Sequence, residues 1–275
     1  MNFDRRTIIA GLGTAAATGL APAALGAETR SGRAPTTRKE WDAIIGSAFR
    51  TGGFTCVRAE PNDEGPFYYE SSPMRRTIAE RLPGVPLRLG ITLGGLAAEL
   101  GHCFPLAGAV VDIWHTSPAG LYSNVGRDLQ PVDTTGQTFL RGHQVTDQNG
   151  YAEFNTIVPG WEVVAAAPPL VVAQRTTHIH VKAFHGHEVL TTQLFFPDPL
   201  IDRLYADVEP YKSNRFLSAP GLGRPYERIR NGQDHFFNEV KAKPMTVERV
   251  NGVLVVKATL AVLSQGDRGF RTLWR

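Results

Sequence analysis

The sequence lacks a marked excess of either charge and, beyond its N-terminus, any long apolar run. Lys and Arg total 29 and Asp and Glu total 26, which leaves a formal net charge of +3. No cluster of basic residues of the kind that nucleic-acid binding needs is present, so no nucleic-acid partner is expected. No apolar run after the N-terminus reaches the roughly 18 residues that a membrane-spanning helix needs. The mature chain is therefore not expected to enter a membrane.

The N-terminus has the layout of an export signal. An arginine pair, Arg5-Arg6, precedes a mildly apolar, Ala/Gly-rich stretch, and small residues near 24–27 offer a cleavage site. The arginine pair favours the twin-arginine route to the periplasm or the extracellular space, whereas a membrane anchor would need a longer and more apolar segment. The sequence predicts a signal peptide at 1–27, a polar linker at 28–37 and one domain at 38–275.

Cysteine is scarce, since Cys56 and Cys103 are the only two in the chain. An even number of cysteines in a protein predicted to leave the cytoplasm favours one disulfide between them. Two separate buried thiols are the alternative.

Glycine and proline are plentiful, at 28 and 19 residues, as expected where turns join many short strands. Apolar residues alternate with polar or small ones from Leu87 to Leu93, which predicts a half-buried strand. Asn251-Gly252 separates two further apolar runs and is a strong hairpin signal. Strands are also predicted at 110–114, 150–157, 177–184, 189–196, 245–250 and 253–262.

A single helix is predicted before these strands. Thr37 and Glu40 form a capping box, apolar residues follow with helical spacing, and Gly52-Gly53 ends the run. No strand–helix–strand alternation follows. The pattern therefore predicts an all-β fold, an antiparallel β-sandwich with one N-terminal helix and long loops.

The segment His178-Ile179-His180 is the first candidate for chemistry. Residues two apart on a strand face the same side, so both imidazoles can reach one metal ion. Neutral imidazole binds Fe, Zn, Cu and Ni alike, so the pair by itself does not identify a metal site.

Several other segments give this histidine pair a context. In chain order they are Gly65-Pro66-Phe67-Tyr68, Pro105-Leu106-Ala107-Gly108-Ala109, Val111-Asp112-Ile113-Trp114-His115, Gly120-Leu121-Tyr122-Ser123, Phe139-Leu140-Arg141-Gly142, Thr156-Ile157-Val158-Pro159-Gly160-Trp161 and Arg175. This ordered set resembles the intradiol ring-cleavage dioxygenases, and most closely their secreted branch, over about residues 56–198.

The resemblance implies an antiparallel β-sandwich that holds non-haem Fe(III) and acts on a small catechol-like aromatic with O₂. It implies Tyr122, His178 and His180 as metal ligands. It also implies that Arg175 stabilises charge on the bound catecholate and that Gln193 supports this arginine. The remaining implied residues are the substrate contacts Gly65, Pro66, Phe67 and Trp161 and the cysteine pair Cys56 and Cys103.

One position departs from the family pattern, in which a second tyrosine ligand directly follows Pro-Gly-Trp. Here residues 159–162 read PGWE, so Glu162 takes that position. A carboxylate can bind iron and accept a proton, but its ordinary pKa is near 4.3 rather than the 10 of a phenol. Glu162 is predicted as a substitute ligand and catalytic residue; a pure base and a solvent-facing residue are the alternatives. Other candidates for the missing ligand are Tyr68, Tyr69 and Tyr151.

A second departure is an apolar insert at 163–173, which is expected to narrow or cover the pocket or to pack against a second subunit of a homodimer.

Three functions stay open. The first is an intradiol dioxygenase that cleaves a catechol-like aromatic between its two hydroxylated carbons. The second is an iron oxygenase or oxidase of altered chemistry, because of Glu162. The third is a non-catalytic binding module, which the retention of the other site residues disfavours.

Overall fold

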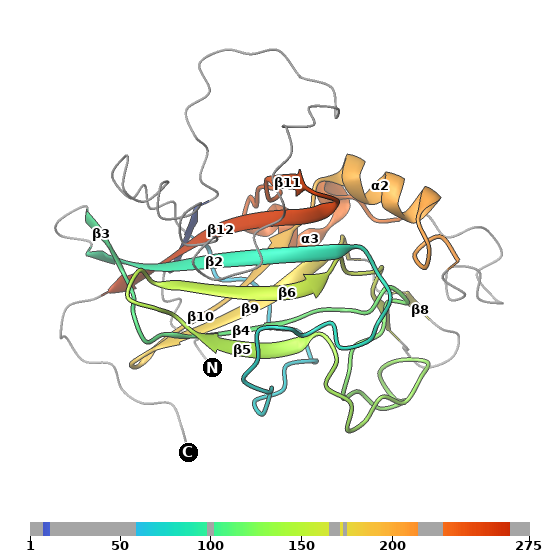
Figure 1. The fold of residues 1–275 in the computed structure, drawn as a ribbon, viewed down its shortest axis with the longest axis horizontal. Helices are drawn as coiled ribbons and strands as arrows, with labels where there is room; N and C mark the ends of the chain where they lie inside the picture. Colours follow the sequence, from blue (N-terminus) through green and yellow to red (C-terminus); the bar gives the residue numbers. More distant parts are fainter. Residues whose placement is uncertain are drawn as a thin grey trace, which may run out of the picture.

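The fold is a sandwich of two β-sheets, as the sequence predicts (Figure 1). The computed structural model describes residues 8–11, 59–97, 102–164, 171–172, 175–213 and 228–264. Strands make up most of the regular structure in these residues, and helices are few.

Two long strands form the centre of the first sheet. β2 (Pro86–Ala97) and β12 (Val253–Ser264) are neighbours over nearly their whole length. Each is flanked on its other edge by two shorter strands in succession. These are β6 (Tyr151–Ile157) and β3 (His102–Pro105) beside β2, and β11 (Val247–Val250) and β1 (Ile8–Gly11) beside β12.

The central pair corrects one detail of the prediction. An antiparallel sandwich is expected, and the other strand pairs in the described residues are antiparallel, but β2 and β12 are parallel. The chain between them builds the second sheet before it returns, and a parallel pair requires a long connection of this kind. Periodicity identifies a strand but not its direction.

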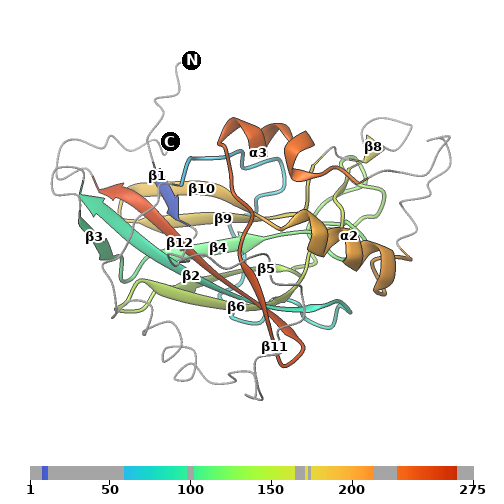
Figure 2. The same cartoon turned by 90° about the horizontal axis from the view of Figure 1, so that it is seen from above.

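The second sheet carries the candidate site. Its antiparallel strands are, in order, β10 (Glu188–Phe195), β9 (His178–His185), β4 (Val110–Trp114) and β5 (Arg141–Val145). Seen from above, these strands cross those of the first sheet at an angle (Figure 2). Inside the predicted insert, β7 (Val163–Val164) pairs with β8 (Val171–Val172) as a separate hairpin.

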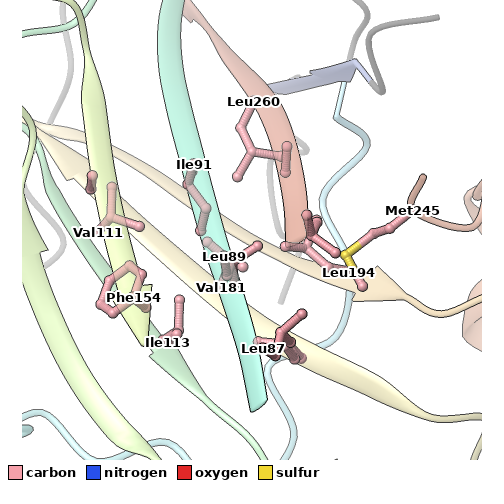
Figure 3. Packing of buried hydrophobic residues seen from close by; sticks show 14 of the residues in the cluster. Leu87, Leu89, Ile91, Val111, Ile113, Phe154, Val181, Leu194, Met245 and Leu260 are labelled. Atoms are coloured by element: carbon pink, nitrogen blue, oxygen red, sulfur yellow. The ribbon is translucent and has the colours of Figure 1, made fainter. Parts of the chain in front are cut away.

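A single hydrophobic core fills the space between the two sheets (Figure 3). Alternate residues of β2, β4, β6, β9 and β12 enter it, among them Leu89, Val111 and Val181. Burying a side chain of this size stabilises the fold by about 1.5–3 kcal/mol. Because side chains alternate along a strand, His178 and His180 point to the opposite face of their sheet, away from this core.

The strand positions predicted from alternation are confirmed. Asn251 and Gly252 make the turn between β11 and β12, with φ of 49° and 81°, the positive values that a two-residue hairpin turn requires. The other predicted strands overlap with β2, β4, β6, β9, β10, β11 and β12.

Two short helices were not predicted. α2 (Asp198–Asp207) follows β10 directly and buries Ile201 and Leu204. α3 (His235–Glu239) follows the 3₁₀ turn η2 (Asn231–Gln233). Each is too short, or buries too few residues, to produce a clear helical period. No helix in the described residues is long and apolar enough to cross a membrane.

Some predictions fall outside the described residues. The helix predicted from Thr37, the residue Cys56 and the side chain of Cys103 all lie there, so the disulfide stays a prediction. Inside the predicted signal peptide, the backbone of Ile8–Gly11 pairs with β12 as β1. The division into signal, linker and domain also stays a prediction.

Candidate metal centre

The candidate site lies on the outer face of the second sheet, where β4 ends and β9 begins. His178 and His180 are on this face of β9. Trp114 of β4 is the cross-strand neighbour of His180 and stacks on its ring, with centroids 4.7 Å apart. The loop after β4 brings Tyr122 to the same place, and the loop after β6 brings Glu162.

Four donor atoms from these side chains converge. The Nε2 atoms of His178 and His180 are 3.0 Å apart. The Oε2 atom of Glu162 lies 3.3 Å from the Tyr122 hydroxyl and 3.7 Å from His178 Nε2. Ligand atoms about 2.0–2.2 Å from one metal ion lie roughly 3.0–3.6 Å from one another. These three distances are therefore close to those between ligands around a single ion.

Both histidines are held in the neutral form. Burial is the largest cause that lowers the pKa of His178 and of His180, and the charge of Arg175 lowers both further. His178 Nδ1 lies 2.7 Å from the Thr176 carbonyl oxygen, which can only accept, so Nδ1 carries the proton and the Nε2 lone pair faces the site. Nδ1 of His180 is buried without a hydrogen-bond partner in the described part of the chain.

A buried glutamine fixes the backbone of Tyr122. Gln130 Oε1 accepts a hydrogen bond from Tyr122 N at 3.0 Å, and Gln130 Nε2 donates one to Tyr122 O at 2.9 Å. The Thr134 hydroxyl donates to the same carbonyl oxygen at 2.7 Å. Phe67 stacks on the tyrosine ring, with centroids 4.5 Å apart. Side chains thus bond to the backbone of the loop after β4, as a neighbouring strand would do within a sheet.

Burial raises the pKa of both oxygen donors. The pKa of Glu162 rises to about 7 because its carboxylate is buried, an effect that Arg175 partly offsets. The pKa of Tyr122 lies well above its ordinary value because of burial and the nearby carboxylate. Without a cation the phenol keeps its proton and donates a hydrogen bond to Glu162 Oε2. A metal ion would favour the phenolate.

A glycine allows the loop after β6 to reach the site. The Thr116 hydroxyl donates to Gly160 O at 2.8 Å. A Cβ at position 160 would lie 2.3 Å from the Pro118 carbonyl oxygen, which is too close for any side chain. This approach holds the loop after β6 against the loop after β4, and so brings Glu162 to Tyr122.

Arg175 is held beside the donors by two residues. Its Nε donates to Asp234 Oδ2 at 2.8 Å, and its Nη2 donates to Gln193 Oε1. Gln193 Nε2 donates in turn to the Asp63 carbonyl oxygen at 2.8 Å. Burial alone would raise the pKa of Asp234, but the Arg175 charge and backbone N–H donors hold it below its ordinary value. The sequence predicts the glutamine contact but not the aspartate.

The predicted substrate contacts lie at different depths. Gly65 has a φ of 68°, and a Cβ there would lie 3.7 Å from His180 Cε1, so the backbone approaches the site at this point. Phe67 and Trp161 are buried, whereas Pro66 is exposed. Their roles in binding a substrate stay predictions.

The other tyrosine candidates have different surroundings. The Tyr68 hydroxyl bonds to Asp112, which is also on the outer face of the second sheet. Tyr69 is 36% exposed. Tyr151 lies in β6 of the other sheet. Of the candidates weighed from the sequence, Glu162 is the residue found beside the donors.

The donor set suits a metal ion that prefers oxygen and nitrogen ligands. In the part of the chain that the structure describes, no three His, Cys, Asp or Glu side chains form a metal-holding group by themselves. The fit therefore depends on Tyr122 as well as on His178, His180 and Glu162. Phenolate and carboxylate are hard donors, and together with imidazole they suit iron.

Comparison with known proteins identifies the class. A family model described as Dioxygenase matches residues 63–210, more than half of the chain. This stretch contains all four donors, Arg175 and Gln193, and the sandwich of mostly antiparallel strands agrees with it. The chain belongs to the intradiol ring-cleavage dioxygenase family.

Particular relatives agree with this assignment. The chlorocatechol 1,2-dioxygenase of Pseudomonas putida is 31% identical over 145 residues, which cover 50% of this chain and 53% of that one. The catechol 1,2-dioxygenase of Pseudomonas sp. (strain EST1001) is 29% identical over 202 residues, 69% of this chain and 60% of that one. The chain thus spans about half the length of the curated relatives it matches. An intradiol ring-cleavage dioxygenase structure from Tetranychus urticae has a TM-score of 0.55 at 26% identity and covers 74% of this chain and 92% of that one.

Proposed function

We propose that this protein is a non-haem iron-dependent dioxygenase of intradiol type. It cleaves a catechol-like aromatic between its two hydroxylated carbons, and both atoms of O₂ enter the product, in which these carbons become carboxyl groups. The observation that carries the proposal is the convergence of a tyrosine, a glutamate and two histidines, whose Nε2 atoms are 3.0 Å apart. Relatives named as catechol and chlorocatechol 1,2-dioxygenases support it.

Tyr122, His178, His180 and Glu162 would hold the metal. With Fe(III) held there, both catechol oxygens would chelate the ion, and the ring would become open to attack by O₂. Glu162 Oε2 would take a proton from a substrate hydroxyl; support comes from burial, which raises the pKa of this carboxyl in the metal-free site to about 7.

Arg175 stabilises the negative charge of the substrate. Its side chain is only 12% exposed and is fixed at Nε and Nη2. Its charge already lowers the pKa of Glu162 and of His178, so its field acts on the donors. A fixed cation in a site that excludes most water stabilises anionic states without having to reorganise.

The two alternatives from the sequence have less support. A binding module has no need for four converging donors and a buried arginine beside them. Altered chemistry rests on Glu162 alone, whereas the relatives that match carry catechol-type 1,2-dioxygenase names.

Metal analysis, absorption spectra and O₂ uptake with catechol test the proposal. His178→Ala and His180→Ala should each lose most of the bound iron, while the exposed His187→Ala should keep it. Tyr122→Phe keeps the ring packed on Phe67 but should abolish the phenolate-to-Fe(III) absorption. Wild-type iron content in both histidine variants would show that the pair is structural and that the proposal is wrong.

A further inference from the structure

Asp234 contacts the site from outside the segment that the family model matches. That segment ends at residue 210, whereas Asp234 lies just before α3. Its side chain is fully buried. A buried carboxylate needs strong partners, and those of Asp234 lead directly to the site.

The two oxygens of Asp234 have different partners. Oδ1 accepts a hydrogen bond from Phe237 N at 3.0 Å and caps α3. Oδ2 accepts from Arg175 Nε at 2.8 Å and from Thr176 N at 2.7 Å. Asn or Ser would serve as well for the cap alone. Asn has one oxygen and one NH₂ group, so it cannot accept hydrogen bonds on both sides, and the carboxylate is explained by the Oδ2 partners.

The guanidinium of Arg175 is thereby fixed on three sides. Asp234 holds Nε, Gln193 holds Nη2, and the Phe236 ring lies 4.4 Å from Cζ. Nη1 makes no hydrogen bond to the residues that the structure describes. Among these residues, none competes with an anionic substrate for Nη1.

The same segment also fixes the residues that precede the metal ligands. Asn231 is buried, and its Oδ1 accepts a hydrogen bond from the Thr176 hydroxyl at 2.8 Å. The Thr176 carbonyl oxygen is the partner of His178 Nδ1. Asn231 and Asp234 thus hold the chain between Arg175 and His178 through side chains that are themselves buried.

We propose that Asp234 is a positioning residue for the reaction: its carboxylate fixes the Arg175 guanidinium in the orientation that stabilises an ionised catechol. The inference rests on the proposed function. Asp234 acts through Arg175 and does not touch the substrate. An arginine held by a carboxylate presents its charge with a fixed direction, which a freely rotating side chain does not.

Binding of nitrocatechol to iron-loaded protein tests this role, because the visible absorption of this probe reports whether its hydroxyls are ionised. Asp234→Ser keeps an oxygen that can cap α3 but loses both bonds of Oδ2. We expect probe affinity to fall on the order of tenfold, as for the loss of a hydrogen bond to a charged group. We also expect the bound probe to ionise at a higher pH than in the wild type.

Two further variants separate positioning from stability. Asp202 accepts a hydrogen bond from Arg228 Nε at 2.8 Å, and Arg228 lies shortly before η2 in the chain. Asp202→Asn therefore weakens a contact near η2 without changing the partners of Arg175, and it should leave probe affinity and ionisation unchanged. Because Asp234 acts through Arg175, the double variant Arg175→Lys/Asp234→Ser should bind the probe no more weakly than Arg175→Lys alone.

Iron content and thermal unfolding are measured for every variant, with Asp234→Asn as a second substitution. Weaker probe binding at wild-type iron content supports the inference. Wild-type affinity and ionisation in Asp234→Ser overturn it, as does a parallel loss of iron and folded protein in both Asp234 variants. If the wild type itself neither binds the probe nor consumes catechol, the failure belongs to the proposed function instead.

Discussion

A glutamate in place of a tyrosine changes the pH range in which a site residue exchanges a proton. In the site without a metal ion, burial raises the pKa of the Glu162 carboxyl to about 7, so it gains and loses a proton near neutral pH, whereas a bound cation would favour the carboxylate. A tyrosine hydroxyl ordinarily does so only near pH 10. The glutamate is also a weaker electron donor to iron than a phenolate, so an Fe(III) ion bound here should be easier to reduce than one held by two tyrosines.

Substitution of Glu162 tests both properties. Glu162→Gln removes the base and should lower catechol turnover on the order of a hundredfold, with weaker iron binding. Glu162→Tyr should restore a second phenolate and deepen the visible absorption of the iron-loaded protein. Iron content, absorption spectra and O₂ uptake are the measurements. Glu239→Gln, at an exposed position, should change none of them, and unchanged values in both Glu162 variants would contradict the ligand role.

At the scale of elements, the site is assembled where loops from the two sheets meet. The loop after β6 comes from the first sheet and the loop after β4 from the second. Gly160 is a point of close approach, because a Cβ there would lie 2.3 Å from the carbonyl oxygen of Pro118. The distance between Glu162 and Tyr122 therefore depends on a residue that carries no chemistry.

Gly160→Ala should separate the two loops. The added methyl group cannot fit 2.3 Å from a carbonyl oxygen, so we expect a loss of about 1–3 kcal/mol in the free energy of unfolding and weaker iron binding. Denaturant unfolding and iron titration measure these effects. Gly232→Ala is the control, since a Cβ there would meet nothing within 4 Å. Equal stability of the two variants would argue against a tight contact at Gly160.

The sequence predicts those elements that depend on local pattern. Alternation places β4, β6, β9 and β10, and the two-residue spacing places His178 and His180 on one face. It does not show that β2 and β12 run parallel, because direction depends on the whole path of the chain. Gln130 and Asp234 were also missed: each acts through contacts with a distant segment, and the only local signal for Asp234 is that of a helix cap.

At the scale of the molecule, a buried neutral histidine couples stability to pH. His115 is 1% exposed, and burial lowers its pKa from 6.5 to about 4. Its Nδ1 donates to the Thr116 carbonyl oxygen at 2.9 Å, so its Nε2 accepts from the hydroxyl of Thr156, which is in β6, at 2.7 Å. Protonation of Nε2 would remove this acceptor between the two sheets.

The sign of the effect follows from the lowered pKa. The stabilisation that neutral His115 gives the fold is fully present above pH 6.5, the pKa of this histidine in the unfolded chain. It is lost as the pH falls through about 4, the pKa in the folded chain. Across this window the free energy of unfolding should fall by up to about 1.4 kcal/mol per pH unit more in the wild type than in His115→Gln. Urea unfolding at several pH values measures the difference. His187→Gln, at an exposed position, should follow the wild type; parallel curves for wild type and His115→Gln would contradict the account.

Export is a further property of the whole chain, and it stays a proposal. If Arg5-Arg6 directs the twin-arginine route, changing both to lysine should leave the precursor in the cytoplasm, since that route reads the guanidinium pair. Cell fractionation with detection of the protein in each fraction measures this. Continued accumulation outside the cytoplasm would indicate the general secretory route instead.

Because β2 and β12 are neighbours in the first sheet, this sheet can close only late in the synthesis of the chain. β2 is among the first strands made on the ribosome and β12 among the last, so one edge of β2 has no partner until synthesis is nearly over. An open strand edge is a site at which other chains can pair, and contacts between distant segments form slowly. A route that carries folded proteins would let this closure occur in the cytoplasm before transport, with the candidate metal ligands already in place. A route that carries unfolded chains would postpone both closure and metal binding until after the membrane is crossed.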